Sequence, residues 1–169
     1  MISQWKSSLT KVSLILLAFS LLSACGFQLR GVESVPESMR YVTLLPGNAS
    51  TELQSSLRKI MKVNGIEHQA SAPYQIKLLS SRYKRRTATL TRSSDVDEYE
   101  ISLSVVFMIA DSQGKPLTSD ITLQRERTYT YDSDAATASS EREAQLRKEL
   151  HSSLAQSIIR RYLASQPKK

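Results

Sequence analysis

Two groups of residues carry most of the potential chemistry in this sequence: one cysteine and one dense run of basic residues. Cys25 is the only cysteine among 169 residues, so an internal disulfide is excluded and a thiolate zinc site lacks its ligands. The two histidines, His68 and His151, are far apart in the sequence and have no partner motif, which disfavours a histidine metal centre. The thiol is therefore a candidate attachment point, and the basic run is a candidate anion site.

Cys25 directly follows a segment with the pattern of an export signal. Residues 1–11 carry Lys6 and Lys11, and residues 12–24 are nearly all apolar and uncharged. The apolar run is shorter than the roughly 20 residues of a membrane-spanning helix. Leu22-Ser23-Ala24-Cys25 resembles the lipobox of bacterial lipoproteins, which implies that Cys25 is acylated after cleavage before it. The alternative is an ordinary signal peptide with a chance cysteine.

The basic run is Arg82-Tyr83-Lys84-Arg85-Arg86. On a strand, alternation would place Arg82, Lys84 and Arg86 on one face, and Tyr83 and Arg85 on the other. Arginine and lysine at this spacing suit phosphate groups. The alternative is a solvated outer face, or an edge strand protected by its charges.

The overall charge also favours an anionic partner. The formal net charge is +7, and removal of Lys6 and Lys11 with the signal leaves +5. Lipid headgroups, phosphates and nucleic acid all suit such a charge. Export from the cytoplasm disfavours nucleic acid.

Other polar residues are weaker candidates for chemistry. Arg92 is expected at the tip between two strands. The acidic residues beyond it are expected to balance the basic run across a hairpin rather than to perform acid–base catalysis; they are Asp95, Asp97, Glu98 and Glu100. His151 adjoins two serines on a predicted helix, where neighbouring side chains point apart, so it is interpreted as a surface or boundary residue. No catalytic motif is present, which argues against an enzyme, and a hydrolase that uses His151 is kept as a third hypothesis.

These residues are positioned by a predicted order of β-α-β-β-β-α. A strand over 40–45 precedes a helix that Ser50 or Thr51 caps and Asn64-Gly65 ends. Strands are predicted over 74–92, around 101–109 and over 117–131, with a bulge near Ser80–Ser81. A loop over 132–140 precedes a long helix with a Ser140–Glu143 capping box. We expect an α+β fold, a two-layer sandwich with a largely antiparallel sheet and two helices on one face.

The start of the predicted mature chain resembles a known family. Cys25-Gly26-Phe27-Gln28-Leu29-Arg30-Gly31 is similar to the mature start of the LptE family of lipopolysaccharide (LPS) assembly lipoproteins. Further segments agree: Val35–Met39, Asn64-Gly65, Glu98-Tyr99 and Leu154–Leu163. The resemblance implies an outer-membrane lipoprotein on the periplasmic side, without enzymatic activity or a cofactor. It also implies that the protein binds LPS and acts as plug and assembly partner of the LptD β-barrel. Gly26, rather than Asp, is consistent with the outer membrane.

The resemblance also suggests site residues. In the family, basic residues at the tip between the second and third strands contribute to LPS binding, and this position is Arg92 here. In some relatives a second basic residue lies in the loop before the last helix. The corresponding position here is Ser140, which puts a clamp made of two cations in doubt. Arg82, Lys84, Arg85 and Arg86 are our own candidates for the missing charge.

The domain assignment follows from these observations. Residues 1–24 are expected to form a lipoprotein signal peptide, residues 25–39 a lipidated N-terminus and connector, residues 40–165 an LptE-like α/β domain, and residues 166–169 a short tail. The alternative function is a structural or adaptor lipoprotein that binds only protein partners.

Overall fold

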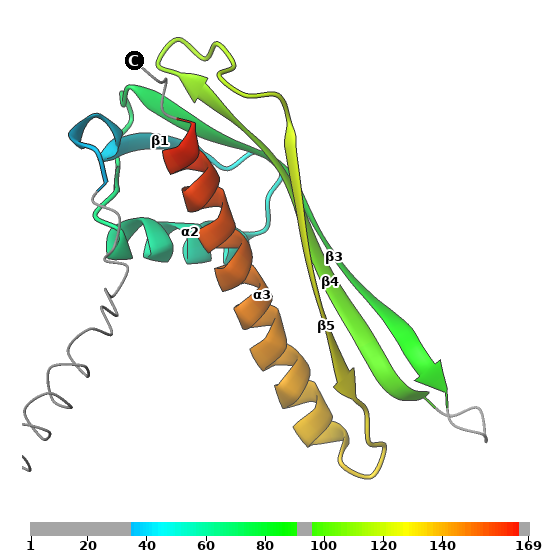
Figure 1. Ribbon diagram of the computed structural model, residues 1–169. Helices are drawn as coiled ribbons and strands as arrows, with labels where there is room; N and C mark the ends of the chain where they lie inside the picture. Colours follow the sequence, from blue (N-terminus) through cyan, green and yellow to red (C-terminus); the bar gives the residue numbers. More distant parts are fainter. Residues whose placement is uncertain (1–34, 91–95, 166–169) are drawn as a thin grey trace, which may run out of the picture. The chain divides into compact units, whose positions relative to one another are not determined.

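The computed structural model describes residues 35–90 and 96–165. It confirms the predicted order of elements and adds two short ones (Figure 1). The elements are a 3-10 helix η1 (Glu37–Met39), β1 (Tyr41–Leu45), α2 (Thr51–Val63), β2 (Glu67–His68), β3 (Tyr74–Leu90), β4 (Val96–Asp111), β5 (Ile121–Thr130) and α3 (Ala136–Ala164).

One mixed sheet has the strand order β2-β1-β3-β4-β5. The long strands β3, β4 and β5 form an antiparallel meander, whereas β1 is parallel to both β2 and β3. The parallel pair is possible because α2 carries the chain back from the end of β1 to the start of β3. Sequence reasoning missed β2 because two residues are too few to show a period.

The ends of α2 match their predicted signals. Ser50, and not Thr51, is the N-cap, because its hydroxyl accepts a hydrogen bond of 3.3 Å from the Leu53 amide. The Ser50 amide in turn donates to the Ser81 hydroxyl at 2.7 Å, which ties the helix start to β3. At the other end Gly65 has a φ of +69°, the left-handed conformation expected beyond a helix C-terminus.

The predicted start of α3 was wrong. The helix begins at Ala136, its N-cap Ala135 makes no side-chain cap, and the Ser140 hydroxyl donates to the Ala136 carbonyl at 2.9 Å inside the helix. The capping box fails because Glu143 turns toward the sheet instead of toward the helix start. Ser140 therefore lies within α3 and not in the preceding loop.

The last strand is shorter than predicted. It begins at Ile121 instead of Leu117, because the preceding residues form a connection held by local bonds. The Leu117 amide donates to the Ile109 carbonyl at 2.8 Å, and the Ile109 amide donates to the Thr118 hydroxyl at 3.0 Å. The predicted bulge in β3 is confirmed, as a register shift between Leu78 and Ser80.

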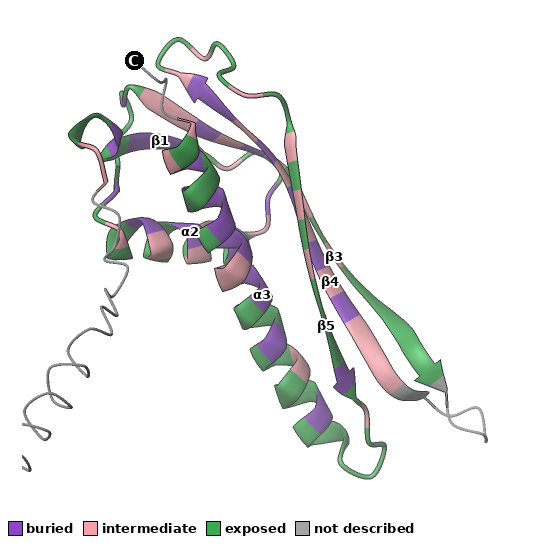
Figure 2. Ribbon diagram, in the orientation of Figure 1, coloured by how far each residue is buried: buried purple, intermediate pink, exposed green. Residues whose placement is uncertain are grey.

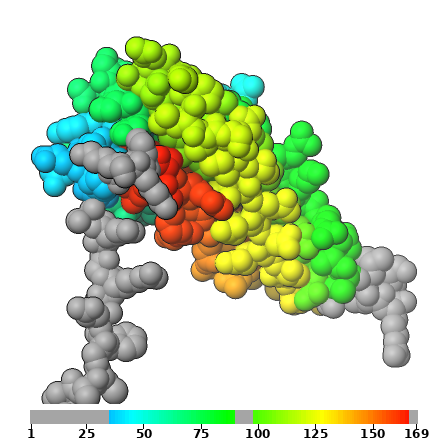
Figure 3. All heavy atoms as spheres, turned by 45° about the horizontal axis from the view of Figure 1, so that its top comes forward, coloured from blue at the N-terminus to red at the C-terminus, as the bar shows by residue number. Residues whose placement is uncertain are grey.

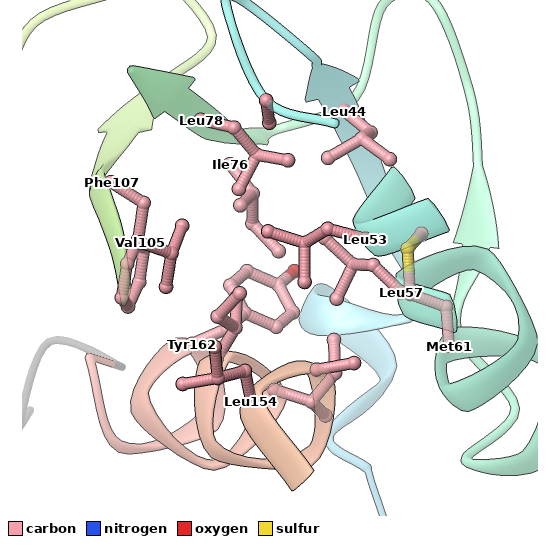
Figure 4. Close-up of a cluster of buried hydrophobic side chains, with 14 of the residues drawn as sticks. Leu44, Leu53, Leu57, Met61, Ile76, Leu78, Val105, Phe107, Leu154 and Tyr162 are labelled. Atoms are coloured by element: carbon pink, nitrogen blue, oxygen red, sulfur yellow. The ribbon is translucent and has the colours of Figure 1, made fainter. Parts of the chain in front are cut away.

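A single hydrophobic core joins the sheet to the two helices that cover one of its faces. Apolar residues recur every three or four positions along both helices and point into this core. Among Leu53, Leu57, Ile60 and Met61 of α2, only Ile60 is partly exposed. Figure 4 shows Leu53, Leu57 and Met61 of α2 converging with Leu154 and Tyr162 of α3 and with the sheet residues Ile76 and Phe107. The described residues between Val35 and Ser165 thus share one hydrophobic core, as expected of a domain that folds as a unit.

The antiparallel meander continues beyond this core. Most buried residues lie at the end of the sheet near β1, α2 and the C-terminal half of α3, whereas β3 from Lys84 to Thr89 is exposed (Figure 2). The N-terminal half of α3 runs beside this extension, and in the space-filling view the strands and α3 lie directly against each other (Figure 3). Within the described residues, no helix has the length and apolar character needed to cross a bilayer.

Candidate ligand-binding surface

The basic run lies on the extended part of β3, and its side chains alternate as predicted. Arg82, Lys84 and Arg86 lie on the face of the sheet that no helix covers, opposite Ser104, Ser102 and Glu100 of β4. We call this the outer face. Tyr83 and Arg85 lie on the inner face, toward α3. The run therefore supplies cations to two separate environments.

On the outer face, Arg86 already has a partner. Its Nε and one terminal nitrogen donate to the two carboxylate oxygens of Glu100 at 2.7 and 2.9 Å, a bidentate pair. This pair raises the pKa of Arg86 and lowers that of Glu100. The predicted cross-strand balance of charges is confirmed for Glu100, and Glu98 accepts a hydrogen bond from Thr89. Asp95 lies outside the described residues.

Arg82 and Lys84 differ from Arg86 because neither has an ion-pair partner among residues 35–89 and 98–165, whose side chains the structure describes. Both side chains are exposed, and their β4 neighbours are the small hydroxyls Ser104 and Ser102. Their Cα atoms are about 7 Å apart, as two residues on one face of a strand must be. The nearest carboxylate by register is Glu100, which lies diagonally across from Lys84 on β4 and is already paired with Arg86. Glu126 lies one strand further away, opposite Ser102. This couple is the accessible positive charge of the outer face.

Arg85 instead helps to join the sheet to α3. Its guanidinium donates to the Glu143 carboxylate at 2.8 Å and lies 4.4 Å from the centre of the Tyr99 ring. The hydrogen bond to Glu143 raises the pKa of Arg85. Because an anion would have to displace Glu143, Arg85 is a less accessible candidate for ligand binding than Arg82 or Lys84.

Glu143 is the centre of a polar cluster between α3 and the sheet. Besides Arg85, the hydroxyls of Tyr83 and Tyr129 donate to its carboxylate, at 2.7 and 2.5 Å. Burial alone would raise the pKa of Glu143, but the three hydrogen bonds outweigh it and hold this pKa below its usual value. Burial and the same carboxylate raise the pKa of Tyr129 to about 12. These hydrogen bonds hold α3 against the sheet in a part of the interface that has few apolar residues.

His151 is not the surface or boundary residue that we expected. Only 4% of it is exposed, and its Nδ1 donates to the Arg147 carbonyl at 2.8 Å. The helices α2 and α3 are in contact, and Glu52 at the start of α2 lines the same cavity as His151. His151 lines a cavity of about 170 Å³ together with Glu52, Tyr83 and Arg147. No serine hydroxyl is hydrogen-bonded to His151 in the described part of the chain, so the geometry offers no nucleophile–base pair.

Two of the predicted site residues, Cys25 and Arg92, lie outside the described residues. The assignments of Cys25 to lipidation and of Arg92 to ligand binding therefore stay predictions. The polar cluster around Glu143, in contrast, was missed. Its only sequence signal is the placement of Tyr83 and Tyr129 on the inward-facing positions of two strands.

Comparisons with known proteins agree with this fold. The family model described as LptE, lipopolysaccharide-assembly, matches residues 37–162. A minor lipoprotein from Acinetobacter baumannii has a similar solved structure, with 25% identity, a TM-score of 0.61 and coverage of 76% of this chain and 93% of that chain. A search of curated protein sequences found no match.

Two further solved structures show the same fold at lower identity. Rare lipoprotein B from Shewanella oneidensis is 21% identical, with a TM-score of 0.61 over 75% of this chain and 96% of that one. Lipoprotein B from Nitrosomonas europaea is 23% identical, with a TM-score of 0.60 over 80% and 88%. The two-layer fold, and above all the family match over nearly all of the described residues, establish that this chain belongs to the LptE family of lipopolysaccharide-assembly lipoproteins.

Proposed function

We propose that this LPS-assembly lipoprotein binds LPS directly, through cations at the extended end of its sheet. The observation that carries the proposal is the couple of Arg82 and Lys84, two exposed cations without an ion-pair partner among the described residues. Lipid A is anionic through its phosphates, and such cations can replace the divalent ions that aggregate it. Arg92, at the end of the same hairpin in sequence, is the third proposed contact.

The proposed setting is the periplasmic side of the outer membrane. After cleavage of residues 1–24, acyl chains on Cys25 would anchor the protein, since several chains together give stable attachment. We further propose that the domain, with no enzymatic role, occupies the LptD β-barrel as plug and assembly partner. The extended end of the outer face carries serine, threonine and charged side chains, which suit a polar barrel interior.

The test is LPS binding by the folded domain, residues 26–169, at low and moderate salt. We expect salt-sensitive binding that Arg92→Glu weakens and that Arg82→Glu with Lys84→Glu weakens further. A single exposed ion pair contributes on the order of 1 kcal/mol or less, so the double change should lower the affinity about tenfold. The matched controls are Lys115→Glu for the single change and Lys115→Glu with Lys148→Glu for the double change, because both lysines are exposed and lie away from the extended end of the outer face.

Each outcome separates the two functional hypotheses. If the control variants lost as much affinity as the test variants, LPS binding would depend only on net charge. The outer face would then not be the binding site. No LPS binding by folded wild type would favour an adaptor that binds protein alone. Co-purification with LptD that survives the Arg82 and Lys84 changes would separate barrel assembly from ligand binding.

A further inference from the structure

A second basic surface lies on α2, far along the fold from the extended hairpin. Arg58, Lys59 and Lys62 are all exposed on this helix and have no ion-pair partner in the described part of the chain. Residues three and four positions apart are neighbours on a helix, so these three cations share one face. No carboxylate on α2 lies within four residues of Arg58 or Lys62. The three cations therefore repel one another, and binding of an anionic partner would reduce this repulsion.

An apolar groove lies directly beside these cations. It has a volume of about 370 Å³ and runs between the C-terminal end of α2 and β2. Met61 and Ile66 supply its apolar lining, Arg58 and Lys62 its positive charges, and Glu67 its one carboxylate among the described residues. One helical turn from Lys59, the side chain of Val63 is 72% exposed. Cations beside exposed apolar groups form an amphipathic surface, the kind that binds at a membrane interface.

The length of chain outside the structure limits where this surface can lie. Val35, the first described residue, is ten residues from Cys25. A fully extended chain of ten residues spans at most about 36 Å. This argument depends on the lipidation of Cys25 proposed above. In an anchored protein Val35 therefore stays within that distance of the bilayer, which lets the domain turn its basic surfaces toward the headgroups.

We propose that the α2 surface, formed by Arg58, Lys59, Lys62 and Val63, docks onto anionic phospholipid headgroups of the membrane that carries the anchor. The three cations bind the phosphates, and Val63, on the same exposed side of the helix, faces the boundary between headgroups and acyl chains. Attraction of this kind contributes on the order of 1 kcal/mol per cation and falls off within a Debye length. Docking would orient the domain with respect to the membrane before it meets any partner.

The test uses residues 26–169, which contain the complete core and no cysteine, and vesicles free of LPS. The vesicles are phosphatidylcholine alone or mixed with phosphatidylglycerol. We expect sedimentation with the mixed vesicles only. In the variant Arg58→Glu/Lys59→Glu/Lys62→Glu, the partition coefficient should fall on the order of 100-fold. The matched control is Lys115→Glu/Arg142→Glu/Lys148→Glu, which changes the net charge equally at exposed residues elsewhere.

A second measurement reports which surface touches the lipid. Val63→Cys, labelled with an environment-sensitive dye, should shift to the blue with mixed vesicles, whereas a label at Ser112→Cys should not. Absence of binding to mixed vesicles, or equal loss in both triple variants, would overturn the proposal. These vesicles contain no LPS, so a failure here leaves the proposed LPS site standing, and a failure of LPS binding leaves this surface standing.

Discussion

The hydroxyl of Tyr83 on β3 donates a hydrogen bond of 2.7 Å to the carboxylate of Glu143 on α3, sixty residues later in the chain. Tyr129 and Arg85 donate to the same carboxylate. A mostly buried carboxylate with three donors thus replaces apolar packing where the meander and α3 extend beyond the main core. This makes Glu143 a specific link between the helix and the strand that carries the basic run.

Glu143→Gln should destabilise the protein. The amide keeps the size of the side chain but loses the charge, leaves Arg85 without its counter-ion and offers one acceptor oxygen in place of two. Hydrogen bonds to a charged group contribute roughly 1.5–3 kcal/mol each, so we expect a loss of about 2 kcal/mol. Urea unfolding followed by circular dichroism measures the change, with the exposed neighbour Glu141→Gln as the control. A loss below 0.5 kcal/mol, the ordinary range for a surface substitution, would contradict this account.

The contribution of Glu143 to stability should also depend on pH. Its pKa in the folded protein lies below the usual value of 4.5, so the folded state binds this proton less readily than the unfolded state does. The stabilisation is therefore complete above the unfolded pKa and is lost as the pH falls through the folded pKa. The difference in free energy of unfolding between wild type and Glu143→Gln should narrow as the pH is lowered below about 4.5. A constant difference down to pH 2 would refute the assignment.

Two glycines with positive φ should respond differently to substitution. Gly47 has a φ of +48°, and an added Cβ would lie 1.9 Å from the Leu78 carbonyl oxygen, a backbone atom that cannot move aside cheaply. Gly65 has a φ of +69°, but a Cβ there meets nothing within 4 Å. Gly65→Ala should cost about 1 kcal/mol from backbone strain alone, and Gly47→Ala clearly more. Thermal unfolding of the two variants compares them directly, and an equal cost would show that the bulged strand at Leu78 can shift.

The fold could be predicted where its sequence signals are local, and not where it depends on contacts between distant segments. In α2 and α3 the apolar residues recur with the period of a helix, and in β4 with the period of a strand. These elements could therefore be predicted from their own sequence. The parallel pairing of β1 with β3 and the two-residue β2 arise from contacts between distant segments, which no local pattern records. Leu44 shows this, since its amide donates to Nδ1 of His68, 24 residues away.

The candidate site was predictable only in part, for the same reason. Alternation correctly divided Arg82, Lys84 and Arg86 from Arg85. It could not show that Glu100 lies opposite Arg86 while serines lie opposite Arg82 and Lys84, because register across a hairpin depends on bulges. The capping box of Ser140 and Glu143 failed because Glu143 gains more from three tertiary donors than from one amide at the helix start.

A last prediction concerns the difference between paired and unpaired cations on the outer face. Glu100→Gln removes the partner of Arg86 and should free its guanidinium to join Arg82 and Lys84 as a third cation on one face. If this face binds LPS as proposed, the affinity should rise, by up to about fivefold for one exposed pair. Removal of both partners in Arg86→Gln/Glu100→Gln should change the affinity little, because the pair is lost as a unit and the net charge of the outer face stays the same.

The control for this rise is Glu141→Gln, which removes one exposed negative charge from α3 and leaves the outer face unchanged. Binding is measured at low and moderate salt for all three variants, because an added cation must also steepen the salt dependence. If Glu141→Gln raised the affinity as much as Glu100→Gln, only the net charge would matter. If Arg86→Gln/Glu100→Gln weakened binding as strongly as Arg82→Gln, the pair would have to open when LPS binds, and availability of the cation would not decide the site.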